Sequence, residues 1–268
     1  MNFPLAVYNA LRNAVQKVYT FLHLETHEST TGRPLAISPI DAITLAIFKQ
    51  QQNIETKKSL FEMAAPSCTY KTFVEAVNRA GVYLLLFIGL IIKTNRMVAH
   101  LVKFTDSTDV PVCLLKNAKT NRTMRGLAAF SKTGKGWFYG LKLHLSADLE
   151  GRVLALRITS GNSDDRNIFK KMNRLLKGIF VADAGYISKD LERDFFIDNE
   201  RVLFATPRAN MKRLATELQS FLQSQRMKIE SHFRELKLFR GLITSLPRSL
   251  DGMFTHYLAS IIAHLMAA

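Results

Sequence analysis

The chain has 268 residues, of which 47% are hydrophobic and 22% charged, values ordinary for a soluble globular protein with one large or two modest domains. Its 37 lysines and arginines outnumber its 22 acids, so the formal net charge is +15 and the pI is near 9.9. This balance favours a polyanionic partner, either nucleic acid or an acidic membrane surface. It leaves open a ribosome-associated or merely well-solvated basic protein.

Cysteine usage and hydropathy argue against disulfides, zinc and membrane insertion. Cys68 and Cys113 lie far apart, with no CxxC spacing and no companion pair of histidines, so we expect neither a disulfide framework nor a zinc site. The longest apolar run, residues 81–92, is shorter than the roughly 20 residues that cross a bilayer. The N-terminal residues lack the features of a signal peptide, and no predicted helix combines a basic face with an aromatic apolar face. We therefore expect a cytoplasmic protein that does not bind membranes.

The first third of the chain is predicted to be helical, from apolar residues at helical spacing. We expect helices over residues 5–24, 38–52, 56–65, 69–80 and 82–95. Ser38 followed by Pro39 is typical of a helix N-terminus, and Gly81 is expected to cap the C-terminus of the fourth helix. Three short helices over residues 38–80 are compatible with a DNA-binding helix-turn-helix and equally with any small helical bundle. We expect a helical N-terminal domain over residues 1–97.

From about residue 98 the pattern changes to strands that alternate with helices. We expect strands over residues 102–105, 137–145, 153–158, 179–182 and 202–205, and helices over residues 163–176, 188–196, 214–237 and 253–266. This order favours an α/β domain over residues 98–268, with helices packed against a mixed sheet. Residues 137–145 alternate cleanly, which puts Lys142 and His144 on the polar face of their strand.

Basic residues are concentrated in the middle of the chain. Residues 110–147 contain seven cations and no acid, namely Lys116, Lys119, Arg122, Arg125, Lys132, Lys135 and Lys142. The part over residues 117–136 is rich in Lys, Thr, Ser and Gly, so we interpret it as a loop that contacts nucleic-acid phosphates. A solvated loop without a partner is the alternative.

Two aspartates follow strand-like runs. Asp106 ends the first predicted strand and Asp183 ends the fourth, and ligands of open α/β sheets gather at strand ends. If these strands are neighbours, the two carboxylates converge, and Glu230 can approach from a helix packed across the sheet. Oxygen ligands favour Mg²⁺ or Mn²⁺, and two such ions about 4 Å apart support in-line phosphoryl transfer. A single Asp after a strand is more often a turn or cap residue, so the hypothesis depends on the set.

The remaining acids of this region have structural interpretations. We interpret Asp109 as a loop acid and Asp164 and Asp165 as helix caps. Glu230 itself is flanked on its helix by Arg226 and Lys237, which lie within a narrow arc of the same face. A surface helix with ion pairs has the same pattern.

Five blocks in order along residues 100–265 resemble the DDE transposases of bacterial insertion sequences. They are FTDS at 104–107, GWFYGLKLH at 136–144, GNSDDR at 161–166, VADAGY at 181–186, and the spacing of Arg226, Glu230 and Lys237. The last block is similar to the Tyr-Arg-Glu-Lys signature of that family. Gln223 stands where the signature has its tyrosine, so we leave Gln223 out of the expected active site.

The resemblance implies an RNase H-like catalytic domain that cuts DNA at the ends of a mobile element and joins the freed 3′-hydroxyl to target DNA. It implies Asp106, Asp183 and Glu230 as catalytic residues and as ligands of two Mg²⁺ ions, for which Mn²⁺ substitutes. Arg226 and Lys237 would bind DNA phosphates, or alternatively orient Glu230.

Further contacts with DNA are expected from Lys142, Arg122, Arg125, Lys132 and Lys135, with His144 near a phosphate. The implied partners are double-stranded DNA, as terminal inverted repeats and as target, and a second copy of the chain in a homodimer or larger assembly. The implied location is the bacterial cytoplasm.

Two other functions fit the same residues. An RNase H-like nuclease would use the same three acids without strand transfer, and a catalytically inactive DNA-binding protein would use only the basic residues. The predicted site does not separate them.

Overall fold

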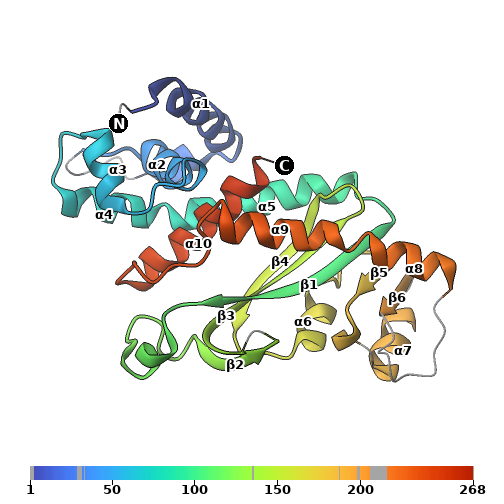
Figure 1. Ribbon diagram of the computed structural model, residues 1–268. Coiled ribbons are helices and arrows are strands. Elements are labelled where there is room, and N and C mark those ends of the chain that lie inside the picture. The colour runs from blue at the N-terminus through green and yellow to red at the C-terminus, as the bar shows by residue number, and fades with distance from the viewer. Residues whose placement is uncertain are drawn as a thin grey trace. The chain divides into compact units, whose positions relative to one another are not determined.

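The computed structural model describes residues 3–28, 32, 34–134, 136–186, 188–197, 200–205 and 216–267 (Figure 1). The chain forms two compact units. Unit 1 is helical and comprises Met1–Leu90, Leu236–Leu242 and Leu246–Ala267. Unit 2 contains the sheet and is built on Ile91–Glu235 and Ile243–Ser245.

Unit 1 is organised around one buried helix. Its helices are α1 (Leu5–Phe21), the 3-10 helix η1 (Leu24–His27), α2 (Pro39–Gln51), α3 (Lys57–Ala64), α4 (Tyr70–Arg79), the first part of α5 (Gly81–Met97), and α10 (Leu250–Leu265). Residues 42–50 of α2 are all buried, because α1, α4 and α10 pack around this helix. The predicted start of α2 is confirmed, since the Ser38 hydroxyl accepts a hydrogen bond from the Asp41 backbone N–H and Pro39 opens the helix.

The prediction for Gly81 was wrong. The backbone of Ala80 is helical and α5 starts at Gly81 itself, so α4 and α5 run on as one helical stretch. A Cβ at Gly81 would lie 2.8 Å from Oγ1 of Thr255, so this glycine permits close packing against α10. The combined stretch, Tyr70–Met97, has 28 residues and is long and apolar enough to cross a membrane by length and composition alone. The expectation that the protein does not bind membranes stays a prediction.

The two compact units divide the chain differently from the predicted domains, residues 1–97 and 98–268, which stay a prediction. Helix α10 lies within the predicted second domain, residues 98–268, but packs with α2 and α4 in unit 1. Its contacts with α2 include polar ones, because the Gln50 side-chain amide donates to the Ser260 hydroxyl (3.0 Å) and lies 2.9 Å from Nδ1 of His256. Whether α2, α3 and α4 act as a helix-turn-helix stays a prediction.

Unit 2, as far as its residues are described, contains a six-stranded mixed sheet. Its strands are β1 (Val102–Pro111), β2 (Ala129–Thr133), β3 (Gly136–Asp148), β4 (Val153–Ser160), β5 (Gly178–Ala182) and β6 (Arg201–Ala205). The order is β2-β3-β1-β5-β6, and β4 also pairs with β3. Strand β1 is antiparallel to β3 and parallel to β5, and β5 is parallel to β6. The predicted α/β class with a mixed sheet is therefore confirmed.

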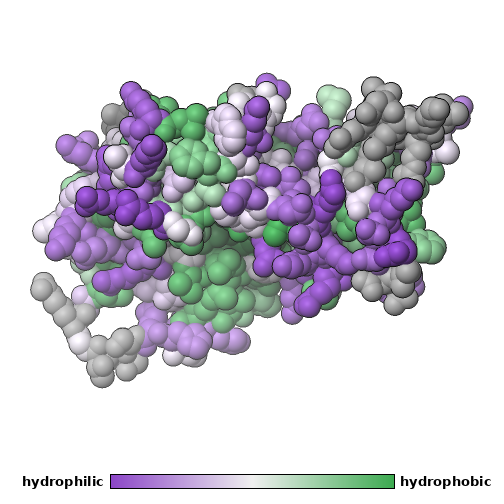
Figure 2. All heavy atoms as spheres, turned by 90° about the horizontal axis from the view of Figure 1, so that it is seen from below, coloured by the Kyte–Doolittle hydropathy of each residue, from purple (hydrophilic) through white to green (hydrophobic). Residues whose placement is uncertain are grey.

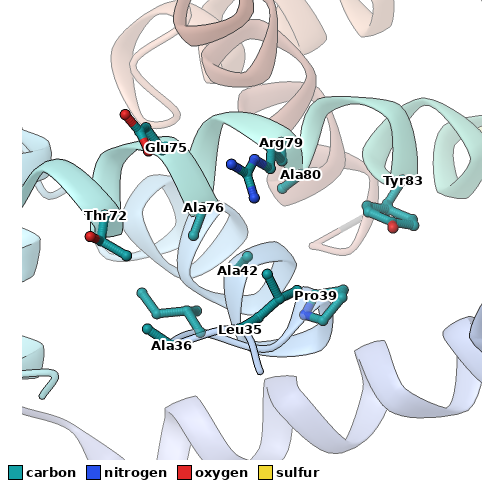
Figure 3. Close-up of a pocket in the computed structure, with 11 residues that line it drawn as sticks. Leu35, Ala36, Pro39, Ala42, Thr72, Glu75, Ala76, Arg79, Ala80 and Tyr83 are labelled. Carbon is teal, nitrogen blue, oxygen red and sulfur yellow. The ribbon is translucent and has the colours of Figure 1, made fainter. Parts of the chain in front are cut away.

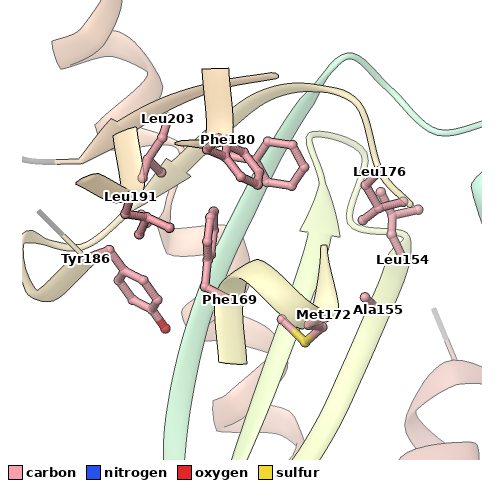
Figure 4. Packing of buried hydrophobic residues seen from close by; sticks show 11 residues of the cluster. Leu154, Ala155, Phe169, Met172, Leu176, Phe180, Tyr186, Leu191 and Leu203 are labelled. Atoms are coloured by element: carbon pink, nitrogen blue, oxygen red, sulfur yellow. The ribbon is translucent and has the colours of Figure 1, made fainter. Parts of the chain in front are cut away.

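Helices cover both faces of this sheet. They are the 3-10 helix η2 (Leu115–Thr120), α6 (Asp165–Met172), the 3-10 helix η3 (Ala184–Tyr186), α7 (Lys189–Ile197), α8 (Glu217–Ser224) and α9 (Met227–Leu238). Figure 1 shows α6 on the side of the sheet opposite to α9. Beneath α6 and α7 lies an apolar cluster in which Phe169 packs against Phe180 and Phe195, with ring centroids 5.8 and 5.0 Å apart (Figure 4).

Several element boundaries differ from the predicted ones. Strand β1 continues to Pro111, so Asp106 lies in its middle and Asp109 is a strand residue opposite Lys142, not a loop acid. The predicted loop over residues 117–136 contains part of η2 and all of β2. The predicted long helix over residues 214–237 is two helices, α8 and α9, separated by a turn at Gln225 and Arg226. The start predicted for it lies outside the described residues.

Candidate active site

The sheet register brings Asp106 and Asp183 together. In the parallel pair, Phe104 lies opposite Val181 and Thr105 opposite Ala182, so one further step sets Asp106 beside Asp183. Neighbouring strands are about 4.8 Å apart and paired residues point to the same side, so the two carboxylates share one face of the sheet. We call this the acid face. The predicted convergence of these two acids is thus present.

The guanidinium of Arg226 binds both carboxylates. One terminal nitrogen lies 3.0 Å from Oδ2 of Asp106 and the other 3.5 Å from Oδ1 of Asp183. Arg226 sits in the turn between α8 and α9, and its Nε is buried with no hydrogen-bond partner among the described residues. Backbone N–H groups complete the carboxylate contacts, from Ser107 to Asp106 (2.8 Å) and from Ala184 to Asp183 (2.7 Å).

The electrostatics leave this pair of acids short of positive charge. Burial raises the pKa of Asp106, the Ser107 N–H and Arg226 lower it, and the neighbouring Asp183 raises it, with an upward shift overall. Burial is the largest of these effects, and a single described guanidinium faces the two carboxylates. The Asp183 side chain is 57% exposed, so the site is open to solvent. Two adjacent carboxylates that share one guanidinium suit a hard divalent cation such as Mg²⁺ or Mn²⁺.

Glu230 does not complete the predicted cluster of three acids. It lies in the first turn of α9 and is exposed. Its backbone N–H donates to the Arg226 carbonyl (3.4 Å), which puts Glu230 one helical turn, about 6 Å along the axis, beyond Arg226. Within the described ranges, no three His, Cys, Asp or Glu side chains form a group that could hold a metal ion. The three-acid metal site stays a prediction.

Gln223, which was not expected at the active site, lies next to the acids. Its side-chain amide donates to the Ala182 carbonyl (3.3 Å), one residue before Asp183. It thereby links the end of α8 to the end of β5. Its place in the signature spacing was the signal that pointed to this position, although the residue type differed from the signature.

Lys142 and His144 lie on the sheet face opposite to Asp106. Leu145 pairs with Asp106, and alternation along β3 turns Lys142 and His144 to the other side. There the Lys142 amine binds Asp165 (3.0 Å), and His144 is buried with Nε2 2.8 Å from the Thr159 hydroxyl. These positions do not support the predicted contacts of Lys142 and His144 with DNA at the acids.

The polar cluster on that face has a structural role. Burial lowers the pKa of His144 to about 4, with Lys142 acting in the same direction and Asp165 in the opposite one. Asp164 is confirmed as the helix cap, accepting from the Asn167 N–H (2.9 Å). Asp165 was wrongly interpreted as a cap, because it is the first residue of α6 and the ion-pair partner of Lys142.

The other predicted DNA-binding cations are mostly on the surface. Arg122, Arg125 and Lys132 are exposed and form no ion pair with any described side chain. The segment that carries the two arginines is anchored by the buried Met124. Lys237 is half-buried in α9, and Lys135 lies outside the described residues. Figure 2 shows hydrophilic residues over much of one face, around a hydrophobic area.

A hollow lies in unit 1. It has a volume of about 120 Å³ and is lined mainly by apolar side chains of residues 35–42 and 72–83, with Glu75 and Arg79 among them (Figure 3). Glu75 is the one acid in this lining as far as the structure describes it, so the hollow lacks the grouped oxygen ligands of a metal centre.

A family model and several solved structures match the chain. The family model described as "Transposase DDE domain" matches residues 97–248. The chain is similar to the piggyBac transposase in a synaptic complex with hairpin DNA, with a TM-score of 0.50 and 9% identity over 98% of this chain and 75% of that one. The Mos1 mariner paired-end complex with Mn gives a TM-score of 0.27 and 9% identity over 90% of this chain and 81% of that one. No curated protein matches the sequence. The first of these likenesses confirms the predicted RNase H-like architecture, with N-terminal helices followed by a mixed sheet with helices.

Proposed function

Because the chain belongs to the DDE transposase family, whose domain spans more than half of its residues, we propose that it cuts DNA at the ends of a mobile element and joins them to target DNA. The observation that carries this proposal is the adjacency of Asp106 and Asp183 on the acid face with Arg226 bound to both. This is a polynucleotidyl transfer in which phosphodiester oxygens are exchanged at phosphorus.

Asp106 and Asp183, with Glu230 from the neighbouring helix, would hold the two Mg²⁺ ions, for which Mn²⁺ would substitute. When bound, such ions supply an activated attacking oxygen and stabilise the leaving oxygen of an in-line phosphoryl transfer. The two aspartates contribute paired oxygen ligands whose charge one arginine leaves partly uncompensated. Arg226, once released from them, would be placed to bind a DNA phosphate through two parallel hydrogen bonds.

The finer proposal is a transposase of a bacterial insertion sequence, acting in the cytoplasm. Cutting at the terminal inverted repeats would leave a 3′-hydroxyl, and this hydroxyl would attack the target strand. The net charge of +15 and the exposed Arg122, Arg125 and Lys132 support binding to double-stranded DNA. Bringing two ends together calls for at least a dimer.

A second candidate function is a catalytically inactive DNA-binding protein. The observation in its favour is the exposed position of Glu230, which the described part of the chain does not gather with the two aspartates. A nuclease without strand transfer shares all three acids with the transposase, so it is separated by its products and not by the site.

Strand cleavage of the DNA that flanks the gene tests the proposal. Purified wild type and Glu230→Gln would be compared in Mg²⁺, Mn²⁺ and Ca²⁺, because an amide keeps the shape of the carboxylate and removes its charge. We expect nicks at the repeat ends with Mg²⁺ or Mn²⁺ in the wild type only, followed by joining to a target plasmid. Binding without nicks would favour the inactive protein, nicks without joining the nuclease, and nicks by Glu230→Gln would remove Glu230 from the active site.

A further inference from the structure

The hairpin of β2 and the start of β3 exposes aromatic rings beside a lysine. Phe130 is 48% exposed, and Trp137, the sole tryptophan, is 60% exposed. In the register, Phe130 lies opposite Tyr139 and Lys132 opposite Trp137, so these four side chains share one face of the sheet. We call these four residues the aromatic hairpin.

The aromatic hairpin lies on the acid face. Side chains alternate along β3, so Leu145 points to the same side of the sheet as Trp137 and Tyr139. Leu145 pairs with Asp106. Along β3, the distance from residue 145 to residue 137 is roughly 26 Å, at about 3.3 Å per residue. That is the length of about eight nucleotides of one DNA strand at 3.4 Å each. Leu141, Leu143 and Leu145, which lie between them on this face, are buried, so DNA that contacts both the acids and the hairpin would pass over the elements that cover these leucines.

Packing accounts for part of the aromatic hairpin but not for Trp137. Phe130 and Tyr139 form a cross-strand ring pair with centroids 5.0 Å apart, an arrangement that stabilises a hairpin. The cross-strand neighbour of Trp137 is a lysine, and no ring contact to Trp137 occurs within the described residues. Its indole is mostly in water, so folding gains little from it.

The charge around the hairpin indicates the ligand. The segment just before β2 carries Lys116, Lys119, Arg122 and Arg125, all exposed, and residues 110–147 contain no acid. Interfaces between proteins are depleted in lysine at their centres. Exposed aromatic rings among cations are instead the composition of surfaces that bind single-stranded nucleic acid, where bases stack on the rings and cations bind the backbone.

We propose that Trp137 and Lys132 form a stacking site for an unpaired base of the DNA bound at the acid face. The proposal deepens the proposed function and rests on it for the identity of the DNA. A base inside a duplex is stacked on both sides, so only an unpaired or extruded base offers a free ring face to the indole. Lys132 binds the neighbouring phosphate.

The sole tryptophan makes the test direct, because its fluorescence reports on position 137 alone. Full-length protein without divalent metal would be titrated with a mixed-sequence oligodeoxynucleotide, either single-stranded or annealed as a blunt duplex. We expect the single strand to quench the fluorescence and the duplex to leave it nearly unchanged. Affinities would come from the anisotropy of labelled oligonucleotides.

Variants separate stacking from charge. Trp137→Ala should weaken single-strand binding about ten-fold and duplex binding less than two-fold, and Trp137→Phe should restore most of the loss. Lys132→Gln should weaken both forms and lower the salt dependence of log K by about 0.7 to 0.9. Phe221→Ala is the matched control, since Phe221 is 59% exposed on α8, and it should change neither affinity.

Equal losses on single strand and duplex in Trp137→Ala, or no loss, would overturn the stacking site. So would a Trp137→Ala variant that dissociates a self-associated protein in sedimentation while its DNA affinity is unchanged, because the aromatic hairpin would then be an interface between copies. Cleavage by the wild type without a response of Trp137 would remove this site and leave the proposed function intact. A response of Trp137 without cleavage would support this site and contradict the proposed function.

Discussion

Arg226 holds two carboxylates that the proposed function requires for metal, so its removal should change stability and metal affinity in opposite directions. In Arg226→Gln, Asp106 keeps the Ser107 N–H and Asp183 keeps the Ala184 N–H, but no cation of the described residues remains between them. The two carboxylates then repel each other without compensation, and the site is open to an added cation.

The exposure of the three side chains, with general magnitudes for ion pairs, gives the size of the stability effect. Removing one partner of a buried ion pair costs roughly 3 to 5 kcal/mol, and the 57% exposure of Asp183 lets water offset part of this, so we expect a loss of about 2 kcal/mol. At roughly 2 to 4 °C per kcal/mol, Tm should fall by about 4 to 8 °C. Without a competing guanidinium, Mn²⁺ should bind about ten-fold more tightly, and the added ion should recover most of the lost Tm.

The assay is thermal unfolding with and without MnCl₂, together with calorimetric titration of Mn²⁺. Arg226→Lys keeps a charge and should fall between the wild type and Arg226→Gln. Arg125→Gln removes an exposed arginine that forms no ion pair with the described residues, and it should change neither quantity. An Arg226→Gln protein that is as stable as the wild type and binds Mn²⁺ no more tightly would show that the guanidinium neither stabilises these acids nor competes with a metal ion for them.

Three further predictions concern residues away from Asp106 and Asp183. Lys142→Ala loses the ion pair with Asp165 and should lower stability by about 1 kcal/mol. In anisotropy titrations it should weaken duplex binding less than Arg125→Ala does, and the opposite ranking would show that Lys142 contacts DNA. Asp148→Ala should lower the free energy of unfolding, measured in urea, by on the order of 3 kcal/mol. The fully buried carboxylate accepts hydrogen bonds from three backbone N–H groups and an arginine. A loss under 1 kcal/mol would contradict this account. His144 has a pKa of about 4 when folded and about 6.5 when unfolded, so the unfolded state binds more protons between these values and stability should fall as pH falls from 6.5 to 4. The slope should flatten in His144→Asn, and an unchanged slope would assign the pH dependence to other groups.

Local signals in the sequence were sufficient for much of the fold. The N-cap at Ser38 and the strand that ends just before Asp183 follow from residues within a few positions of each other. Strand β2 was missed because it has five residues and no buried face, so it lacks the alternation that marks a strand. The break between α8 and α9 was missed because no Pro or Gly marks residues 225 and 226.

The site depended on contacts that sequence patterns do not carry. Arg226 and Asp106 are 120 positions apart, and their ion pair follows from where the α8–α9 turn meets the sheet. Alternation correctly put Lys142 and His144 on one face of β3, but that face is covered by the start of α6, which the strand pattern does not reveal. Asp106 seemed to end a strand because the run DSTD is polar, yet pairing with β3 continues through it.

The packing of α10 into unit 1 has a consequence for the order of events during synthesis. Gln50 and His256 meet across 206 positions, so α2 receives this partner only after the intervening sheet has been made. Until α10 leaves the ribosome, the apolar residues of α2 that it covers stay open to solvent or to a chaperone. Contacts of such long sequence separation also slow folding. The helical unit therefore completes its core only after the sheet has been made, and a ribosome that stops within the sheet would release a chain whose helices before the sheet lack part of their core.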